Sequence, residues 1–319
     1  GVNGTPGQFP TGSWQNTNYF RDIVFVPGAA VNLTGISVSP ASVMGGSSST
    51  GTVTLSSAAP AGGAVVALSS GNAAATVPAS VTVAEGSTTA DFTVSTLAVG
   101  SATTATIAGT YNWTHNTTLT INPPALLSVS LSPATVPGGT SSTGTVTLSG
   151  PAPAGGSAVI LLSGSAAATV PDSVTVAAGA TTATFLATTV PVSISTSVSI
   201  LGSYNGLQTA TLTINAPVLA SVLLSPATLV GGTSSAGTVT LSGAAPAGGE
   251  VVALSSDNGA ATVPVNVTVL GGATTATFTV GTVAVGSTMT ATITGNFSGT
   301  QTATLTINDP GLASVSLSP

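Results

Sequence analysis

The sequence predicts an all-β chain of three tandem Greek-key β-sandwiches. Three observations predict it: a period of 93 residues, apolar residues that alternate with polar ones, and turn residues at short intervals. Prolines mark the period, because Pro40, Pro133, Pro226 and Pro319 are each 93 residues apart. A fixed period indicates that each copy is one structural unit.

The most strongly repeated stretch is Ser128 to Gly156, SVSLSPATVPGGTSSTGTVTLSGPAPAGG, which occurs three times without insertion or deletion. Phe92, Phe185 and Phe278 keep the same spacing. We therefore expect five parts: a loop and strand segment at 1–34, repeats at 35–124, 125–217 and 218–310, and, at 311–319, the first strand of a fourth repeat or an exchanged strand.

The N-terminal segment is expected to be a loop followed by one extra strand. Glycine and proline punctuate residues 1–17, whereas both faces of the strand predicted at residues 19–26 carry apolar residues. The run PGQFPTGSWQNTNYFRDIVFVP resembles the end of a β-sandwich domain of unknown function from secreted bacterial proteins. That resemblance implies a strand without its parent sheet, and such a strand must pair with a sheet elsewhere.

Each repeat carries about seven short strands in its pattern. Val53 and Leu55 fall on one face of their strand and Thr52 and Thr54 on the other, which is the alternation of a half-buried strand. Short strands between turn residues favour a Greek-key sandwich. In the first repeat the expected strands are 35–39, 51–56, 64–69, 74–77, 81–84, 88–95, 103–109 and 117–121, one or two of which merge.

From Gly35 to Pro319 the strand pattern and the period resemble tandem bacterial immunoglobulin-like domains of surface and secreted proteins. The resemblance implies an immunoglobulin-like fold and an extracellular or cell-surface location. The Cys–Trp–Cys signature of antibody domains is missing, since the chain has no cysteine. Tyr111, Tyr204 and Phe297 occupy equivalent positions near the end of a late strand, where we expect them to pack.

The linkers between repeats are short. Asn122 to Leu127 is the first, and its two prolines and apolar residues predict a stiff joint, because flexible linkers are long and rich in Gly and Ser. The corresponding linkers run from Asn215 to Ala220 and from Asn308 to Ala313. We therefore expect a rod of roughly 100–130 Å, estimated from the rise of a strand.

Charge is scarce, and this excludes several functions. Charged residues make up 3% of the chain, there is no lysine, and Arg21 is the only arginine. Nucleic-acid binding and a polybasic membrane anchor both need clustered cations, so we expect neither. The absence of cysteine excludes disulfides and thiolate metal sites. No apolar run is long enough for membrane insertion as a helix.

The titratable residues do not form a catalytic set. His115 is the only histidine, is expected in a hairpin turn, and has no counterpart in the other copies. The acidic residues likewise recur in no other copy, whereas a calcium-bridged array would need several carboxylates in every copy. One ion near Asp257 and Asn258 remains an alternative. We predict no enzyme, no catalytic or metal-binding residues and no cofactor.

Aromatic residues offer an alternative binding function. Trp14, Trp113, Phe9 and Tyr19 could stack on sugar, although packing in the core or in a hairpin is the favoured role. On the alternative interpretation the chain is an adhesin, or a carbohydrate-binding or spacer region of a secreted carbohydrate-active enzyme. The many Ser and Thr residues leave glycans as further partners, because exposed hydroxyls can carry O-linked sugar.

Without lysine, the sheet edges lack the usual protection against pairing with other chains. Strand exchange between successive subunits would cover the two unpaired terminal strands, as in strand-addition assembly. The predicted function is therefore a structural, extracellular one, either a self-associating filament subunit or a slice of a cell-surface stalk. The residues expected to mediate assembly are Tyr19, Phe20, Ile23, Val24, Phe25, Val26, Val315 and Leu317.

Overall fold

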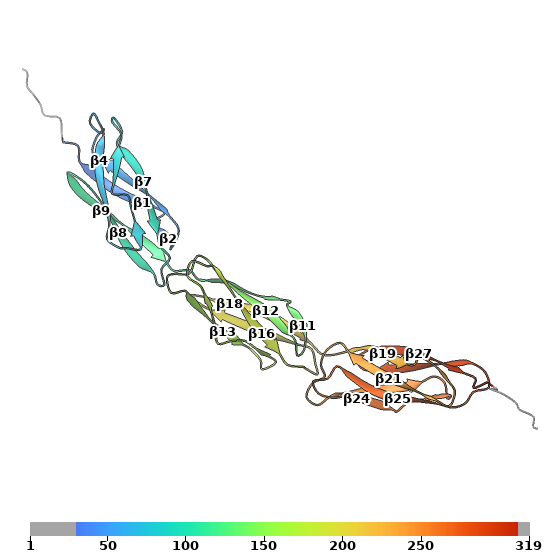
Figure 1. The fold of residues 1–319 in the computed structure, drawn as a ribbon. Helices are drawn as coiled ribbons and strands as arrows, with labels where there is room; N and C mark the ends of the chain where they lie inside the picture. Colours follow the sequence, from blue (N-terminus) through green and yellow to red (C-terminus); the bar gives the residue numbers. More distant parts are fainter. Residues whose placement is uncertain (1–29, 312–319) are drawn as a thin grey trace, which may run out of the picture.

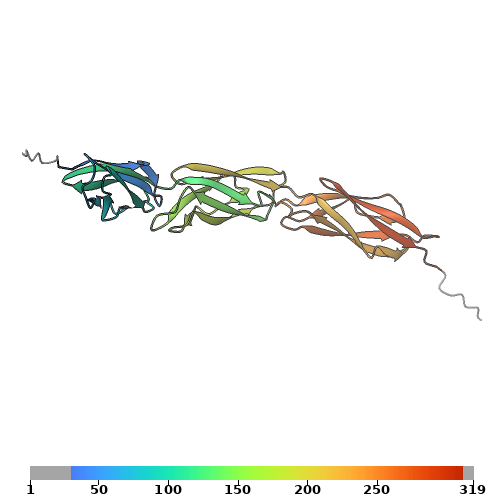
Figure 2. The ribbon, with the colours of Figure 1, turned by 90° about the horizontal axis from the view of Figure 1, so that it is seen from above.

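The computed structural model describes residues 30–311 of the chain (Figure 1). Three repeats, each made of two facing β-sheets, follow one another end to end (Figures 1 and 2). Residues 30–311 form no helix, and hence none that could cross a membrane. The predicted all-β fold of three tandem immunoglobulin-like sandwiches is confirmed.

The first repeat contains nine strands, two of them only two or three residues long. They are β1 (Leu33–Ser39), β2 (Ser42–Met44), β3 (Ser49–Leu55), β4 (Ala64–Ser70), β5 (Ala75–Thr76), β6 (Ser80–Val83), β7 (Thr89–Thr96), β8 (Thr103–Tyr111) and β9 (Trp113–Asn122).

The other two repeats carry the same nine strands in the same order. In the second they are β10 (Leu126–Ser132), β11 (Thr135–Pro137), β12 (Ser141–Leu148), β13 (Ser157–Ser163), β14 (Ala168–Thr169), β15 (Ser173–Val176), β16 (Thr182–Thr189), β17 (Thr196–Ser203) and β18 (Leu207–Asn215). In the third they are β19 (Leu219–Ser225), β20 (Thr228–Val230), β21 (Ser234–Leu241), β22 (Glu250–Ser256), β23 (Ala261–Thr262), β24 (Asn266–Val269), β25 (Thr275–Thr282), β26 (Met289–Asn296) and β27 (Thr300–Asn308).

The two sheets of a repeat differ in size. The four-stranded sheet has the order β1-β3-β7-β5 and the five-stranded sheet the order β2-β9-β8-β4-β6, and the later repeats follow the same orders. The chain changes sheets between β1 and β2, across a cis peptide bond at Ser39–Pro40. Of the strand pairs in the first repeat, only β2 with β9 is parallel. This crossed-over first strand belongs to the immunoglobulin-like Greek key.

Two details of the predicted strands were wrong. The short strand β2 was not predicted, because three residues are too few to show alternation. The hairpin of β8 and β9 is also longer than predicted, since Tyr111 pairs with Trp113 and only Asn112 separates the strands. Asn112 closes this hairpin in the left-handed conformation, with φ of 56°.

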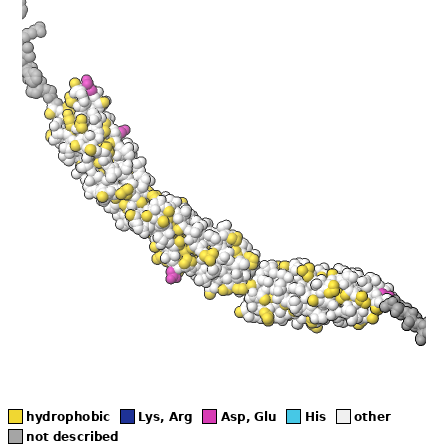
Figure 3. Space-filling view, viewed as in Figure 1, with side chains coloured by type: hydrophobic (Ala, Val, Ile, Leu, Met, Phe, Trp, Pro, Cys, Tyr) yellow, Lys and Arg dark blue, Asp and Glu magenta, His cyan; other side chains and the backbone are white. Residues whose placement is uncertain are grey.

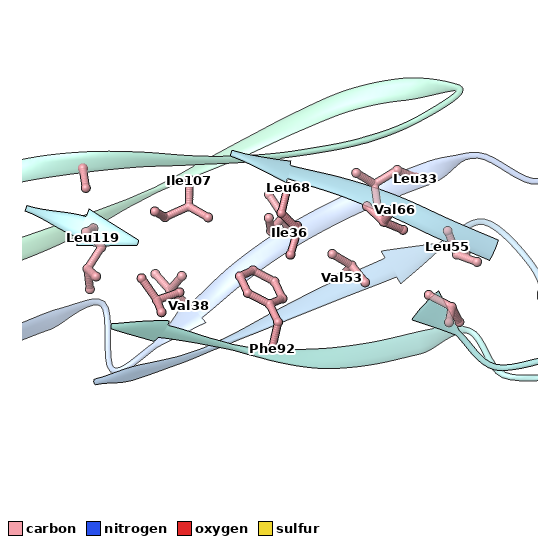
Figure 4. Packing of buried hydrophobic residues seen from close by; sticks show 14 of the residues in the cluster. Leu33, Ile36, Val38, Val53, Leu55, Val66, Leu68, Phe92, Ile107 and Leu119 are labelled. Atoms are coloured by element: carbon pink, nitrogen blue, oxygen red, sulfur yellow. The ribbon is translucent and has the colours of Figure 1, made fainter. Parts of the chain in front are cut away.

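Each repeat has its own apolar core between its sheets. Val53 and Leu55 are buried and their threonine neighbours are more exposed, as the alternation predicts. Figure 4 shows Phe92 between the sheets of the first repeat, beside Ile36 and Leu68. The predicted packing role of the late aromatic residues is confirmed, because these side chains are partly buried against the three cores: Tyr111, Tyr204 and Phe297.

A glycine lies opposite the core phenylalanine in every repeat. Gly51 pairs directly with Phe92 across β3 and β7, and the phenylalanine ring covers the glycine. The same pair recurs in the other two repeats, as Gly144 with Phe185 and Gly237 with Phe278. A Cβ at any of these glycines would overlap the ring, so the aromatic side chain requires glycine there.

Candidate functional site

The lone histidine and the exposed tryptophan lie together on β9. The prediction that His115 sits in a hairpin turn was wrong, because His115 pairs with Gly109 inside the β8–β9 ladder. Trp113 is 62% exposed, so it does not belong to the core. Among the described residues, no titratable side chain forms a hydrogen bond with His115, and no cluster of three or more His, Asp, Glu or Cys is present.

The acidic side chains are dispersed along the rod (Figure 3). Glu85 accepts a hydrogen bond from the Gly62 amide at 3.2 Å, and Asp91 accepts one from the Thr52 hydroxyl at 2.7 Å. These bonds fasten a turn and a pair of neighbouring strands. These two carboxylates therefore serve local structure, and the described residues include no cluster of acidic side chains at one site.

At Asp257 and Asn258, the alternative ion site, side-chain oxygens already accept hydrogen bonds from the protein. The Thr292 amide donates to Asp257 Oδ1 at 2.7 Å, and this bond lowers the pKa of the carboxyl from its ordinary value of 3.8. Asn258 Oδ1 accepts from the Ala260 amide at 3.0 Å, and its Nδ2 donates to the Thr290 carbonyl at 3.0 Å. With these oxygens engaged in a turn, the geometry does not favour a cation there.

A shallow depression of about 450 Å³ lies in the first repeat, over the turn that follows β4. It is lined by residues of one segment, Leu68–Ala73 and Ala75–Val77, none of which has a titratable side chain. The lining therefore has serine and threonine hydroxyls but no acid or base among its side chains that could activate them.

The joints between repeats are held by hydrogen bonds that recur from one joint to the next. On one side of the first joint, the Gly45 amide donates to the Asn122 carbonyl at 2.9 Å. On the other side, the Ala125 amide donates to Ser149 Oγ at 2.9 Å, and the Ser149 amide donates back to the Ala125 carbonyl at 2.9 Å. Only Pro123 and Pro124 remain between the two anchored ends, and proline fixes φ.

The second joint repeats this anchoring. The Gly138 amide donates to the Asn215 carbonyl at 3.1 Å, and Val218 exchanges two hydrogen bonds with Ser242, at 3.0 Å and 2.9 Å. Ala216 and Pro217 are the two residues left between the anchors.

The first linker is shorter than predicted. It was expected to run from Asn122 to Leu127, but Leu126 and Leu127 already belong to β10.

Side chains also pack across each joint. Met44 at the end of β2 lies so close to Gly150 of the second repeat that a Cβ at that glycine would overlap its sulfur. A Cβ at Gly46 would lie 2.9 Å from Pro151 Cγ. The equivalent positions meet at the second joint, where a Cβ at Gly243 would lie 3.1 Å from Pro137 Cβ.

The far end of the third repeat carries the same surface without such contacts among residues 30–311. Val230, which corresponds to Met44 and Pro137, is 44% exposed, and a Cβ at Gly232 would meet no atom within 4 Å. Pro310 is exposed, whereas the corresponding Pro124 and Pro217 are buried. Burial of these positions is thus a property of a joint and not of a single repeat.

An asparagine at the hairpin tip supports the first joint from one side. Asn205 adopts a left-handed φ of 46°, and its Nδ2 donates to the Pro124 carbonyl at 2.9 Å. Asn112 makes the equivalent bond to the Val31 carbonyl at 2.7 Å in the first repeat. The sequence carries a signal for this anchor that was missed, since the two asparagines are one period apart.

The residues predicted to mediate assembly all lie outside residues 30–311. They are Tyr19, Phe20, Ile23, Val24, Phe25 and Val26 at one end and Val315 and Leu317 at the other. Each described repeat already has its own first strand, β1, β10 or β19, paired along one edge with β3, β12 or β21. The described repeats therefore show no vacant first-strand position.

The chain is similar to several solved structures at low sequence identity. No protein-family model and no curated protein matches the chain. Among solved structures, the D0-D1 domain of intimin is 12% identical, with a TM-score of 0.26, and the match covers 58% of this chain and 100% of that one. Titin domains I67–I69, in an E-to-A variant, are 11% identical with a TM-score of 0.27, over 84% of this chain and 94% of that one.

A third similar structure is the Yersinia pseudotuberculosis adhesin InvE, which is 18% identical with a TM-score of 0.31. That match covers 58% of this chain and 60% of the adhesin. These low scores add no information on function.

Proposed function

We propose that this chain is a non-enzymatic, stiff spacer, a stalk-like part of an extracellular or cell-surface protein. The observation that carries the proposal is the joint, which is anchored on both sides and leaves two linker residues between the anchors. A linker of two residues that includes proline has little conformational freedom. Side-chain packing such as Met44 on Gly150 opposes bending further.

A spacer needs length and stiffness more than chemistry. The described residues hold no convergent set of titratable side chains, and Glu85 and Asp91 stabilise a turn and a strand pair. One repeat after another adds length in equal steps, because the period contains no insertion or deletion. A rod of roughly 100–130 Å would hold an attached domain well clear of a surface.

Small-angle X-ray scattering of the whole chain tests this proposal. The double variant Pro123→Gly, Pro124→Gly should broaden the distribution of interatomic distances and shorten its mean, because the first joint then bends. Pro310→Gly is the matched control, since it changes the same linker position beyond the third repeat and should leave the scattering unchanged. Equal scattering from both variants and from the unsubstituted chain would refute the proposed role of the linker.

The cellular location needs a separate experiment. Antibodies against the second repeat should label intact, unpermeabilised cells that make the protein. Labelling only after permeabilisation would contradict an extracellular or cell-surface location, while leaving the mechanical argument unaffected.

The finer form of this proposal is a filament assembled by strand exchange. Since β1, β10 and β19 fill the first-strand positions of the described repeats, the acceptor would have to come from outside residues 30–311. Electron microscopy separates the two forms. Filaments that vanish when residues 1–30 are removed would favour exchange, whereas single rods from both chains would favour the spacer alone.

The exposure of Trp113 favours a second candidate function, contact with glycans. The indole is 62% exposed and pairs across the hairpin with Tyr111, and aromatic rings of this kind stack on sugars. Binding of a polysaccharide that is lost in Trp113→Ala would support this function. Unchanged binding in that variant, or no binding by the intact chain, would exclude a role for Trp113.

A further inference from the structure

The middle repeat exposes a group of aliphatic side chains on the outer face of its five-stranded sheet. Leu162 pairs with Leu201 across β13 and β17, and Ile160 pairs with Ser203, which in turn pairs with Leu207 of β18. Directly paired residues share a face of the sheet, so the four aliphatic side chains form one surface. We call Ile160, Leu162, Leu201 and Leu207 the aliphatic patch.

Three members of the aliphatic patch are well exposed. Ile160 is 55% exposed, Leu162 58% and Leu207 66%, whereas Leu201 is half-buried between its neighbours. Their inward neighbours Val159 and Leu161 fill the core, so the patch is not part of it. Monomeric proteins seldom expose contiguous apolar surfaces of several hundred Å², and such surfaces are often sites of interaction.

The fold does not require the aliphatic patch, because the other repeats lack it. One period away, the first repeat has Ala67, Ser69, Ala108 and Thr114 at the four positions, and the third repeat has Ala253, Ser255, Thr294 and Thr300. These repeats form the same nine strands in the same sheet order. Large aliphatic side chains at these positions of the second repeat alone therefore need another explanation.

The character of the surrounding face indicates the partner. Small exposed side chains such as Ala158, Ser199 and Thr209 share it, so no bulky polar group stands beside the patch, and Asp172 is the only charged residue of the whole repeat. A charged partner would gain little from such a face. A second copy, by contrast, would bring an identical apolar patch against this one across a two-fold axis.

The size of the face also suits a second copy. The five strands hold three to nine residues each and cover roughly 500 Å² in projection at the usual strand spacing and rise, which is more than half of the ~800 Å² that each partner contributes to a standard interface. Sheet faces generally pack on one another about 10 Å apart, with the side chains of the two faces interdigitating.

We propose that the aliphatic patch is a self-association site, through which the middle repeats of two copies of this chain pack sheet face on sheet face. Because the first and third repeats lack the patch, two rods are joined at their middles and not along their whole length. An interface of this size, with an aliphatic centre, is expected to have a dissociation constant in the micromolar range. The site does not depend on the proposed spacer role.

Sedimentation equilibrium of the whole chain, over a hundredfold range of concentration, tests the proposal. The unsubstituted chain should pass from monomer to dimer. A fourfold variant that carries the residues of the first repeat, Ile160→Ala, Leu162→Ser, Leu201→Ala and Leu207→Thr, should stay monomeric with an unchanged far-ultraviolet circular dichroism spectrum. Leu223→Ser is the matched control, because Leu223 is 63% exposed on a four-stranded sheet of the third repeat and has serine at both equivalent positions.

A transplant keeps the proposal falsifiable if the fourfold variant behaves abnormally. Placing Ala253→Ile, Ser255→Leu, Thr294→Leu and Thr300→Leu on the fourfold variant moves the patch to the third repeat and should restore the dimer. A monomeric unsubstituted chain at the highest concentration would overturn the proposal. So would a dimer that persists in the fourfold variant, or one that Leu223→Ser abolishes.

Discussion

Replacing Gly51 with alanine tests whether the core phenylalanine requires glycine at the position opposite it. The added methyl group would overlap the ring of Phe92, which is only 6% exposed and is confined between the two sheets. The ring must therefore move by about 1 Å or more to reach a normal contact distance, and overpacking of this kind costs about 1–3 kcal/mol. Alanine is favoured over glycine in a strand by about 0.5–1 kcal/mol, which offsets part of this cost.

The net expectation is a loss of about 1–2 kcal/mol in the stability of the first repeat. Since 1.4 kcal/mol corresponds to a factor of ten, core amides of β3 and β7 should exchange about 5–30-fold faster with deuterium. Hydrogen-exchange mass spectrometry of the whole chain measures this separately for each repeat. The second and third repeats should keep their exchange rates, because each has its own core.

Gly35→Ala is the matched control in the same repeat. A Cβ at Gly35 would meet no atom within 4 Å, and serine occupies the equivalent position in both other repeats. This variant should be neutral or slightly stabilising, because alanine restricts the unfolded chain. Equal exchange rates in Gly51→Ala and Gly35→Ala would refute the argument. A second test introduces Gly51→Ala into a Phe92→Leu variant. Because residues in contact should couple, the stability cost of Gly51→Ala should be smaller there, and an equal cost would also refute the argument.

Three other experiments test single interactions. Ser142→Ala should destabilise the second repeat by about 1–3 kcal/mol in denaturant unfolding, because Ser142 is 1% exposed and its hydroxyl donates to the Pro133 carbonyl at 2.7 Å; unchanged stability would contradict this. Asn205→Ala should accelerate amide hydrogen exchange in the β17–β18 hairpin, because a φ of 46° costs alanine about 1–2 kcal/mol and the hydrogen bond to the Pro124 carbonyl is lost. Asn205→Gly should accelerate exchange less, because glycine adopts this φ without that cost. In a nuclear magnetic resonance titration, the Thr292 amide shift should follow a carboxyl with a pKa below 3.8, because that amide donates to Asp257. A depressed folded pKa means that this bond stabilises the fold above pH 3.8 and is lost as the pH falls through the folded value; a midpoint at or above 3.8 would contradict the assignment.

The strands of each repeat were predictable because their signal is local. Val53 and Leu55 alternate with threonines within one strand, so the strand can be predicted without knowing which residues of other strands will cover its apolar face. The strand β2 was not predictable in this way. It has three residues, and it is a strand only because Ser42–Met44 pairs with β9, almost a whole repeat later in the chain.

The joints were predictable only in part. Pro123 and Pro124 predicted a stiff linker. The packing of Met44 on Gly150, however, joins residues that are 106 positions apart in different repeats. Nothing local marks such a contact. The aliphatic patch was missed for a related reason, because its members lie on three strands and meet only when Leu162 pairs with Leu201.

The stiffness of the joints is the central claim, and distances between spin labels test it most directly. The chain has no cysteine, so single cysteines can be placed at the exposed and equivalent positions Thr93, Leu186 and Thr279. Double electron–electron resonance on the pairs 93–186 and 186–279, at concentrations where the chain is monomeric, should give one narrow distance distribution each. Both should centre near one repeat length, about 40 Å from the strand rise. Broad distributions that extend to short distances would contradict the account, because the repeats would then move independently about their linkers.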